Sequence, residues 1–282
     1  MRELWYRSGR LSLDSTVVMG ILNVTPDSFS DGGRYASPEK ALERALEMQA
    51  QGAGILDVGA QSTRPGHVPI SPEEEWTRLE PVLDRLRGRI RIPISVDTYY
   101  PAVAKAALVS GADILNDVSG DLHNGMMELA AETGAGLVVM HAGGGADDVG
   151  AAGADVVETV RRFFEKALAR AAEVGLERNR LCLDPGIGFG KTREGDRRLV
   201  SSLPRLMQGL PDMAVLVGAS RKRVVGDCAG EPVPLGERLP GTLAFHSIAQ
   251  WNGARILRVH DVAEAVMAAA VVDELMKEGA DG

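Results

Sequence analysis

The sequence contains few aromatic residues and almost no cysteine. Its 282 residues include only 3 Trp, 4 Tyr and 5 Phe, whereas proteins that bind single-stranded nucleic acids need aromatic platforms on which the bases stack. The two cysteines, Cys182 and Cys228, are too few for a disulfide scaffold or a tetrahedral zinc site. The composition therefore excludes a disulfide-rich secreted domain and argues against a nucleic-acid binder.

The sequence also lacks an excess of basic residues and a long apolar segment. The formal net charge is -8, so the chain as a whole has no basic surface for DNA or RNA. Its longest purely apolar stretch, residues 265–272, is much shorter than a membrane span, and residues 1–5 lack the apolar core of a signal peptide. We therefore expect a cytoplasmic protein with no nucleic-acid or membrane partner.

Glycine and proline, by contrast, are abundant and fall between short apolar runs. The chain has 33 Gly and 14 Pro without a collagen-like period. The apolar runs are continuous rather than alternating, which is typical of strands buried on both faces of a parallel sheet. We predict eight strands, at residues 17–22, 54–58, 92–96, 113–116, 136–140, 181–183, 214–217 and 255–259.

A helical pattern follows each of these runs. The predicted helices lie at residues 38–51, 72–87, 101–109, 124–132, 154–174, 194–208, 236–251 and 262–278. Ser37 and Ser71, each followed by a proline and an acidic residue, are predicted N-caps. The glycines that follow predicted helix ends, where a left-handed residue is common, are Gly52, Gly111, Gly134 and Gly175.

The repeated strand-and-helix unit leaves few architectures open. Two ordinary domains would be joined by a linker, which the sequence does not show, and an open doubly wound sheet usually has five or six strands. Eight units in 282 residues match a closed (β/α)8 TIM barrel of the α/β class. We therefore predict one domain, residues 1–282, in which residues 1–16 form a short N-terminal β-hairpin that closes the bottom of the barrel.

Polar residues stand at the carboxyl ends of the predicted strands, where barrel enzymes bind their ligands. They are Asn23, Asp57, Asp97, Asn116, His141, Asp184, Ser220, Lys222, Arg258 and His260. His141 has no Glu or second His at metal-binding spacing, so we assign it a structural role. Because every strand contributes one of these side chains, we predict the active site at this end of the barrel.

Cations near the last two strands favour an anionic ligand. Arg258 and His260 alternate along the last strand and therefore point to one face, while Lys222 follows the strand before it. Barrels often bind phosphate at this place, and Arg and Lys suit phosphate oxygens. Arg64, in the loop after the second strand, is a further candidate for the same ligand.

Carboxylates and an amide at three other strand ends leave several ligands open. Asp97, Asn116 and Asp184 match the N–H donors of a flat heterocycle, but the same groups could hold a divalent metal or form the acid–base pair of a glycosidase. The scarcity of aromatic residues disfavours a sugar site. The loop that follows Asp184 is not a P-loop, because Pro185 occupies the place of the first glycine.

Seven ordered segments carry a family resemblance. They lie at residues 19–33, 57–59 with 62–66, 95–98, 116–120, 184–191, 218–222, and 238–242 with 255–262. At this spacing the chain resembles the dihydropteroate synthase (pterin-binding) family. The resemblance implies a transferase of folate biosynthesis that joins 6-hydroxymethyl-7,8-dihydropterin diphosphate to 4-aminobenzoate and releases diphosphate and 7,8-dihydropteroate. Departure of diphosphate would leave a cation that the pterin delocalises, which favours an SN1-like path.

The resemblance also implies a role for individual residues. Pterin would contact Asp97, Asn116, Met140, Asp184 and Lys222; diphosphate would contact Asn23, Arg64, Arg258 and His260; aminobenzoate would contact Thr63, Pro65, Phe189, Ser220 and Phe29. The implied catalytic residues are Asp97, Asp184, Lys222 and Asp31, and the implied cofactor is Mg²⁺, held by Asn23. The implied partners are these small-molecule substrates and a second copy of the chain, in a homodimer formed through the last helices.

The chain departs from the family pattern in the second loop. Ala60 and Gln61 stand where the family has Gly-Glu, so a carboxylate is missing. An alternative function is the pterin-binding module of a corrinoid-dependent methyltransferase system. Such a module would not need the pair Arg258 and His260, nor the Ser-Thr-Arg-Pro-Gly loop, and the sequence has both. We therefore favour the synthase.

Overall fold

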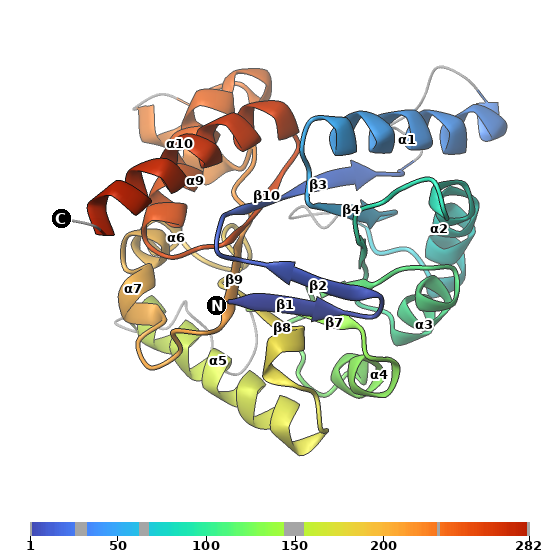
Figure 1. Ribbon diagram of the computed structural model, residues 1–282, viewed down its shortest axis with the longest axis horizontal. Helices are drawn as coiled ribbons and strands as arrows, with labels where there is room; N and C mark the ends of the chain where they lie inside the picture. Colours follow the sequence, from blue (N-terminus) through green and yellow to red (C-terminus); the bar gives the residue numbers. More distant parts are fainter. Residues whose placement is uncertain (1, 26–32, 62–67, 144–154, 230–231, 281–282) are drawn as a thin grey trace.

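The computed structural model describes residues 2–25, 33–61, 68–143, 155–229 and 232–280. In this part of the chain a closed barrel of eight parallel strands stands inside a ring of helices (Figure 1). The strands are β3 (Val17–Asn23), β4 (Ile55–Gly59), β5 (Ile94–Asp97), β6 (Ile114–Asp117), β7 (Gly136–Met140), β8 (Leu181–Asp184), β9 (Ala214–Val217) and β10 (Ile256–Val259). β10 pairs with β3 and closes the barrel, which confirms the predicted TIM barrel.

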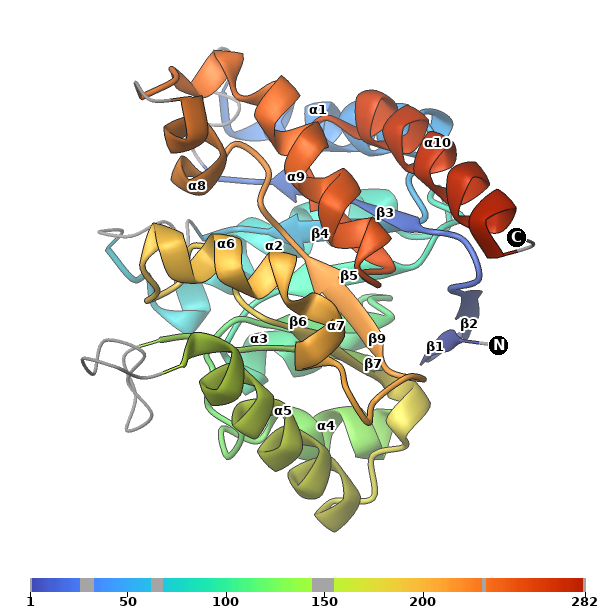
Figure 2. The same cartoon turned by 90° about the vertical axis from the view of Figure 1, so that its left-hand side faces the viewer.

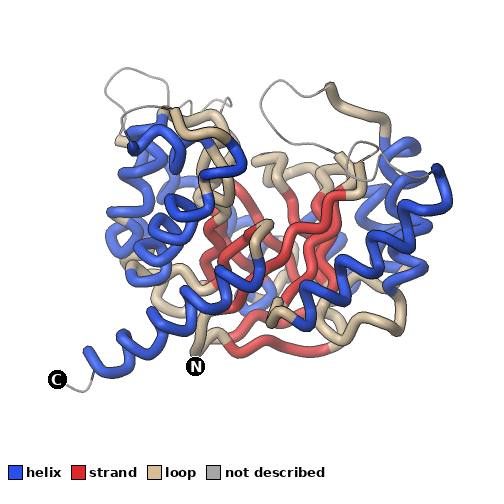
Figure 3. The backbone as a smooth tube through the Cα atoms, turned by 90° about the horizontal axis from the view of Figure 1, so that it is seen from above, coloured by secondary structure: helices blue, strands red, loops and turns tan. Residues whose placement is uncertain are grey.

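The strands form the centre of the molecule, with helices on the outside (Figure 3). Every residue of β4 and β7 is buried, because one strand face turns to the barrel interior and the other to the helices. Strand register sets which strand ends are neighbours: Gly59, Asp97 and Asn116 lie side by side at the carboxyl ends of β4, β5 and β6. The barrel thus brings residues from distant parts of the chain to one edge.

The helices follow the strands in the predicted order. They are α1 (Gly33–Ala50), α2 (Pro72–Leu86), α3 (Pro101–Val109), α4 (Met126–Thr133), α5 (Val156–Glu173), α6 (Arg193–Ser201), α7 (Leu203–Leu206), α8 (Arg223–Gly226), α9 (Leu239–Trp251) and α10 (Val262–Ala280), with short 3-10 helices at Arg178–Arg180, Asp227–Ala229 and Leu235–Glu237. Ser71 caps α2 as predicted, since its side chain accepts the N–H of Glu74. Among the described helices, none combines the length and apolarity needed to cross a membrane.

The single helix predicted at residues 194–208 is wrong. The chain forms two helices there, α6 and α7, with Ser202 between them. The reason is Pro204, which has no N–H to donate to the carbonyl of Val200. Asn252, at the end of α9, donates its side-chain N–H to that carbonyl instead, at 2.9 Å.

Ser37 was predicted to cap the first barrel helix, and this prediction is wrong. α1 begins earlier, at Gly33, so that Ser37 and Pro38 lie inside it. Pro38 is the sixth residue of α1, and the helix continues through it although the missing N–H of the proline removes one backbone hydrogen bond. The four predicted glycine helix ends are confirmed: Gly52, Gly111, Gly134 and Gly175 have φ values of 96°, 109°, 70° and 76°.

The first residues form the predicted hairpin, β1 (Glu3–Tyr6) and β2 (Gly9–Ser12), which are antiparallel. The hairpin lies across the end of the barrel where the strands begin (Figure 1, Figure 2). Leu4 and Leu13 are buried in a cluster with side chains from the barrel interior, among them Met19 and Ile114. The hairpin therefore seals the bottom of the barrel and leaves the opposite end for a ligand.

Candidate active site

The polar residues predicted at strand ends gather at the end of the barrel opposite the hairpin. Asp57 of β4, Asp97 of β5 and Asn116 of β6 are buried there among apolar strands. A buried carboxylate is costly unless it is paired or hydrogen-bonded. The partners of these side chains therefore define the site.

Arg258 of β10 bridges two of these carboxylates. Its Nε donates to Oδ2 of Asp57 and its Nη2 to Oδ2 of Asp97, both at 2.6 Å. Asn116 Nδ2 donates to the same oxygen of Asp57 at 3.2 Å. One guanidinium thus holds together two acids that would repel each other without it. The sequence indicated where Arg258 lies but not these partners.

Burial and neighbouring charges act in opposite directions on the pKa values of Asp97 and Arg258. Burial raises the pKa of Asp97 to about 7; Arg258 opposes the increase, while Asp57 and Glu75 add to it. Burial alone would lower the pKa of Arg258, but Asp57 and Asp97 outweigh it and raise the pKa above its ordinary value. The Oδ1 atoms of Asp57 and Asp97 are buried and accept no hydrogen bond within the described residues. Each of these carboxylates therefore keeps one oxygen whose hydrogen-bonding capacity is unused in this part of the chain.

Asp184, at the end of β8, and Lys222, in the segment that follows β9, are charged side chains that influence each other's pKa. Asp184 Oδ1 accepts the N–H of Gly186 at 2.7 Å. Lys222 Nζ donates to the carbonyl of Ile187 at 2.5 Å and lies 4.4 Å from the centre of the Phe189 ring. Burial raises the pKa of Asp184, against the effect of Lys222. Burial also lowers the pKa of Lys222, to about 8.

The loop between β8 and α6 is held by Lys191. Its Nζ donates to the carbonyls of His141, Gly186 and Phe189 at 2.9, 2.9 and 3.0 Å. Gly186 has a φ of 68°, and a Cβ there would collide with the carbonyl oxygen of His141. The glycine is therefore required by close packing of two site loops, and the lysine ties them together. Sequence reasoning assigned no site role to Lys191.

Ser220 and His260 meet at the edge of the site nearest β10. The backbone N–H of His260 donates to Ser220 Oγ at 3.1 Å, and Oγ lies 3.0 Å from His260 Nδ1. The next residue, Arg221, has a φ of 59°, and its guanidinium is paired with Asp261 at both Nε and Nη2. The predicted diphosphate ligand His260 and the predicted aminobenzoate ligand Ser220 are therefore neighbours.

A second buried carboxyl group, which the sequence pattern does not indicate, lies near enough to Asp97 to raise its pKa. Glu75 of α2 is 2% exposed and accepts the hydroxyl of Thr98 at 2.8 Å. Burial raises the pKa of Glu75 to about 7, and the Thr98 hydroxyl and Arg78 oppose the increase. The first turn of α2 contains Glu73, Glu74 and Glu75. The sequence alone does not show which of the three has a buried side chain.

Gln61, at the departure from the family pattern, is engaged with neighbouring residues. Its Oε1 accepts the N–H of Ile70 at 3.1 Å, and its Nε2 donates to the hydroxyl of Tyr99. The hydroxyl of Tyr100 in turn donates to the carbonyl of Ile70 at 2.8 Å. The amide therefore joins the segment before α2 to the segment after β5.

Two further predicted residues occupy strand ends. Asn23 is half-buried at the end of β3, beside Gly59 of β4, and Met140 is buried at the end of β7, beside Asp184 of β8. The remaining predicted site residues, Phe29, Asp31, Thr63, Arg64 and Pro65, lie outside the described residues. The sequence pattern marks Asp57 as an acid inside the apolar run of β4 but does not indicate a ligand for it.

The fold and this site define a (β/α)8-barrel enzyme with buried acids and cations at the carboxyl ends of its strands. A family model described as pterin binding enzyme matches residues 19–260. The dihydropteroate synthase of Escherichia coli K12 is 41% identical over 273 residues, which cover 96% of this chain and 95% of that protein. The chain therefore belongs to the pterin-binding enzymes and, among them, to the dihydropteroate synthase family.

Solved structures of related proteins agree. The Xanthomonas albilineans dihydropteroate synthase with 4-aminobenzoic acid is 40% identical, with a TM-score of 0.86 and 95% of each chain covered. The same enzyme in complex with 7,8-dihydropteroate is 38% identical, with a TM-score of 0.83, and the match covers 95% of this chain and 96% of that one. The likeness extends over nearly the whole barrel.

Proposed function

We propose that the protein condenses 6-hydroxymethyl-7,8-dihydropterin diphosphate with 4-aminobenzoate to give 7,8-dihydropteroate and diphosphate. The observation that carries this proposal is the carboxylate of Asp97 at the end of β5, which Arg258 holds through Oδ2 and which keeps an unbonded Oδ1 acceptor. A pterin ring presents amidine-like N–H donors that match such acceptors. Family membership and the relatives solved with 4-aminobenzoic acid and dihydropteroate support the same reaction.

The pterin would lie over the ends of β5 to β8. Asp97 and Asn116 would face one edge of the ring and Asp184 with Lys222 another, while Met140 packs against its face. Each of these polar side chains is already held by a neighbour, so that little ordering remains to be done when the ring binds.

The other two ligand groups would lie nearer the mouth of the barrel. The diphosphate would be bound by Asn23, Arg64, Arg258 and His260, and the aminobenzoate by Thr63, Pro65, Phe189, Ser220 and Phe29. The contact between Ser220 and His260 supports neighbouring positions for these two groups, since the pterin methylene carbon must pass from the diphosphate oxygen to the arylamine nitrogen. Among these residues Arg258 would act on two ligands, since it also holds the carboxylate of Asp97, which is proposed to contact the pterin.

The reaction would begin with cleavage of the bond between the pterin methylene carbon and the diphosphate oxygen. Cations of the site stabilise the charge that develops on the departing group. The methylene carbon becomes a cation that the pterin delocalises, and the buried carboxylates Asp97 and Asp184 stabilise it. The arylamine nitrogen then forms the new carbon–nitrogen bond and gives up a proton to solvent. Asp31, which lies outside the described residues, is the remaining proposed catalytic residue.

We propose that Mg²⁺ binds to this site together with the diphosphate. In the described part of the chain, no group of three or more His, Cys, Asp or Glu side chains is arranged to hold a metal. Mg²⁺ is commonly held by one or two protein oxygens together with substrate phosphates and water, and Asn23 offers an amide oxygen at the end of β3. The ion would neutralise charge on the leaving diphosphate.

A two-substrate assay tests the proposal. With Mg²⁺ present, diphosphate should be released from the pterin diphosphate only when 4-aminobenzoate is also added, in a one-to-one ratio with dihydropteroate. Diphosphate release that does not depend on the arylamine would overturn the proposal. So would the absence of dihydropteroate when both substrates are present.

We also propose that the protein forms a homodimer, through α9 and α10. These helices pack side by side, and their outer faces carry exposed large apolar side chains: Ile248, Trp251, Met267, Val271 and Leu275. Three of these stand four residues apart on α10 and form one stripe. Apolar patches of this kind commonly mark a protein interface. The cytoplasm is the proposed location, in keeping with the free thiols of Cys182 and Cys228.

A further inference from the structure

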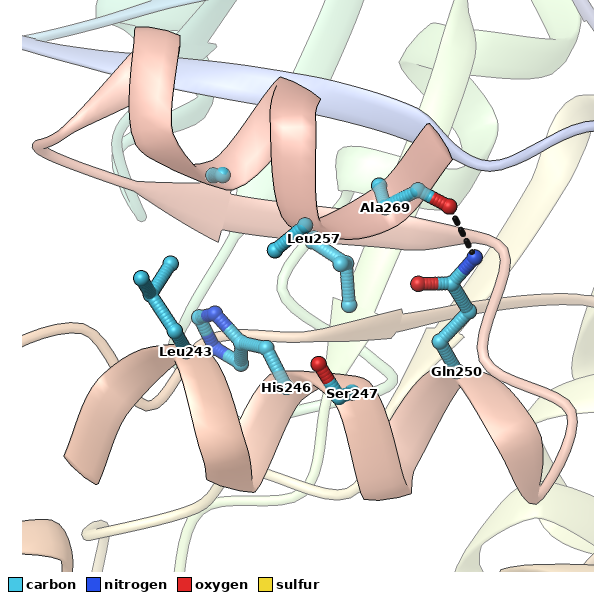
Figure 4. A pocket seen from close by; sticks show the side chains of 8 residues that line it. Leu243, His246, Ser247, Gln250, Leu257 and Ala269 are labelled. Carbon is cyan, nitrogen blue, oxygen red and sulfur yellow. Dashed lines mark hydrogen bonds between the residues drawn. The ribbon is translucent and has the colours of Figure 1, made fainter. Parts of the chain in front are cut away.

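The inner face of α9 carries a row of buried polar side chains. Thr242, His246 and Gln250 stand four residues apart, so they lie on one side of the helix, and they are 2%, 2% and 0% exposed. Figure 4 shows His246 and Gln250 pointing from α9 toward β10 and α10, beside Leu257 and Ala269. A buried polar side chain needs a partner, and each of these three has one outside α9.

His246 holds the backbone just before Ser220. Its Nε2 accepts the N–H of Ala219 at 2.9 Å, in a fully buried contact. An acceptor at Nε2 requires the neutral imidazole with its proton on Nδ1. Burial, with a smaller effect of Lys222, lowers the pKa of His246 to about 3, so that this acceptor is present at all physiological pH values.

Thr242 holds the backbone just after Ser220. Its Oγ1 accepts the N–H of Arg221 at 3.1 Å. Arg221 has a φ of 59°, in the left-handed region that is unfavourable for a residue with a side chain. The conformation is fixed from several sides, since Arg238 also donates to the carbonyl of Arg221 at 3.1 Å.

The two contacts enclose Ser220, whose hydroxyl faces His260. Lys222 comes two residues later, and its ammonium is independently held by the carbonyl of Ile187. We propose that His246 and Thr242 are positioning residues: by accepting the N–H groups on either side of Ser220, α9 sets where its hydroxyl meets the second substrate. The consequence for activity rests on the proposed function, in which Ser220 contacts 4-aminobenzoate.

Two substitutions of nearly equal size separate the hydrogen bond from the packing. His246→Gln places an amide oxygen near the position of Nε2, whereas His246→Met fills the same space without a strong acceptor. We expect His246→Met to raise KM for 4-aminobenzoate about tenfold, the effect of one buried hydrogen bond. KM for the pterin diphosphate should change less than twofold, and His246→Gln should restore most of the loss.

Gln250→Met is the matched control. It removes hydrogen bonds from the same face of α9, but these go to Ala269 and Asp273 of α10 and not to the Ser220 loop. It should therefore lower Tm at least as much as His246→Met while leaving both KM values within twofold of the original. Equal KM changes in His246→Met and His246→Gln, or in His246→Met and Gln250→Met, would overturn the proposal.

Amide hydrogen exchange gives a readout that needs no activity. The peptide that contains Ala219 to Lys222 should exchange about tenfold faster in His246→Met than in His246→Gln. If neither protein folds, Thr242→Val and Thr242→Ser make the same comparison at Arg221. Unchanged exchange in the variant that lacks the acceptor refutes the positioning role, whereas changed exchange without any turnover by the original protein would refute only the proposed reaction.

Discussion

Arg258 Nη2 donates to Asp97 Oδ2 at 2.6 Å, across the barrel mouth from the last strand to the third. The same guanidinium binds Asp57 through Nε, so that one cation balances two buried acids. Removal of a single partner from such a group leaves an uncompensated charge away from water, which is far more costly than the pair itself is stabilising. Loss of any one of these three side chains should therefore destabilise the fold, even though the intact group itself adds little stability.

Arg258→Met tests this relationship. The variant keeps an apolar stem of similar length but leaves Asp57 and Asp97 without their cation, so we expect the free energy of unfolding to fall by about 3 kcal/mol. Urea unfolding at neutral pH measures the change. Adding Asp57→Asn, which removes one of the two charges, should restore about half of the loss. A double variant as unstable as the sum of the single ones would show that the charges are not coupled.

Asp97→Asn tests the free acceptor. An amide of the same shape offers neither the charge nor the full accepting capacity of Oδ1, and a charge-assisted hydrogen bond is worth about 1.5–3 kcal/mol. Affinity for a pterin analogue should therefore fall about 10- to 100-fold, as measured by calorimetry. Asp113→Asn is a suitable control, since Asp113 bonds Ser8 and the N–H of Ile94 at the bottom of the barrel. The affinity of Asp113→Asn for the pterin analogue should equal that of the original protein.

The lowered pKa of Lys222 predicts that affinity for the pterin decreases at alkaline pH. Burial lowers the pKa of its ammonium to about 8, so the charge is present below pH 8 and is lost as the pH rises through that value. Affinity for the pterin should decline above pH 8, well before an exposed lysine would titrate. Lys191 has a similarly lowered pKa, so Lys222→Met and Lys191→Met must be compared. Only the first should abolish the decline.

Val271→Glu tests the proposed dimer. Val271 lies in the middle of the exposed apolar stripe on α10, and a carboxylate there would face its own copy across a two-fold interface. Light scattering coupled to size exclusion should show a dimer for the original protein and a monomer for the variant at micromolar concentration. Val109→Glu, at an exposed site at the end of α3, should leave the mass unchanged. A monomeric original protein would contradict the proposal.

Much of the barrel follows from local sequence. The strands were predictable because each is buried on both faces, so a short continuous apolar run such as that of β7 can be recognised without its neighbours. Polar residues at strand ends were predictable for the same reason, since Asp97 and Asp184 interrupt apolar runs at equivalent places. Pro204 is a helix-breaking signal, but the helical pattern on both sides of it favours a single helix, so the break between α6 and α7 could not be predicted with certainty from the pattern alone.

Contacts across the barrel could not be predicted in this way. The bridge from Arg258 to Asp57 joins residues 201 positions apart and depends on the barrel radius and on side-chain rotamers. His246 was equally hidden, because a single histidine among the apolar residues of α9 has no local signal. Its role depends on the position of Ala219, which another strand determines.

The hairpin of β1 and β2 depends on strands that lie far from it in the sequence. Ser8 Oγ bonds Asp113 Oδ1 at 2.7 Å over a separation of 105 residues, and Leu4 packs against Ile114 and Val138. The apolar side chains of the hairpin therefore have no surface to cover until strands more than a hundred residues away have formed. Such distant contacts are entropically slow to form. We therefore expect the hairpin to dock late in folding, as the step that completes the barrel core.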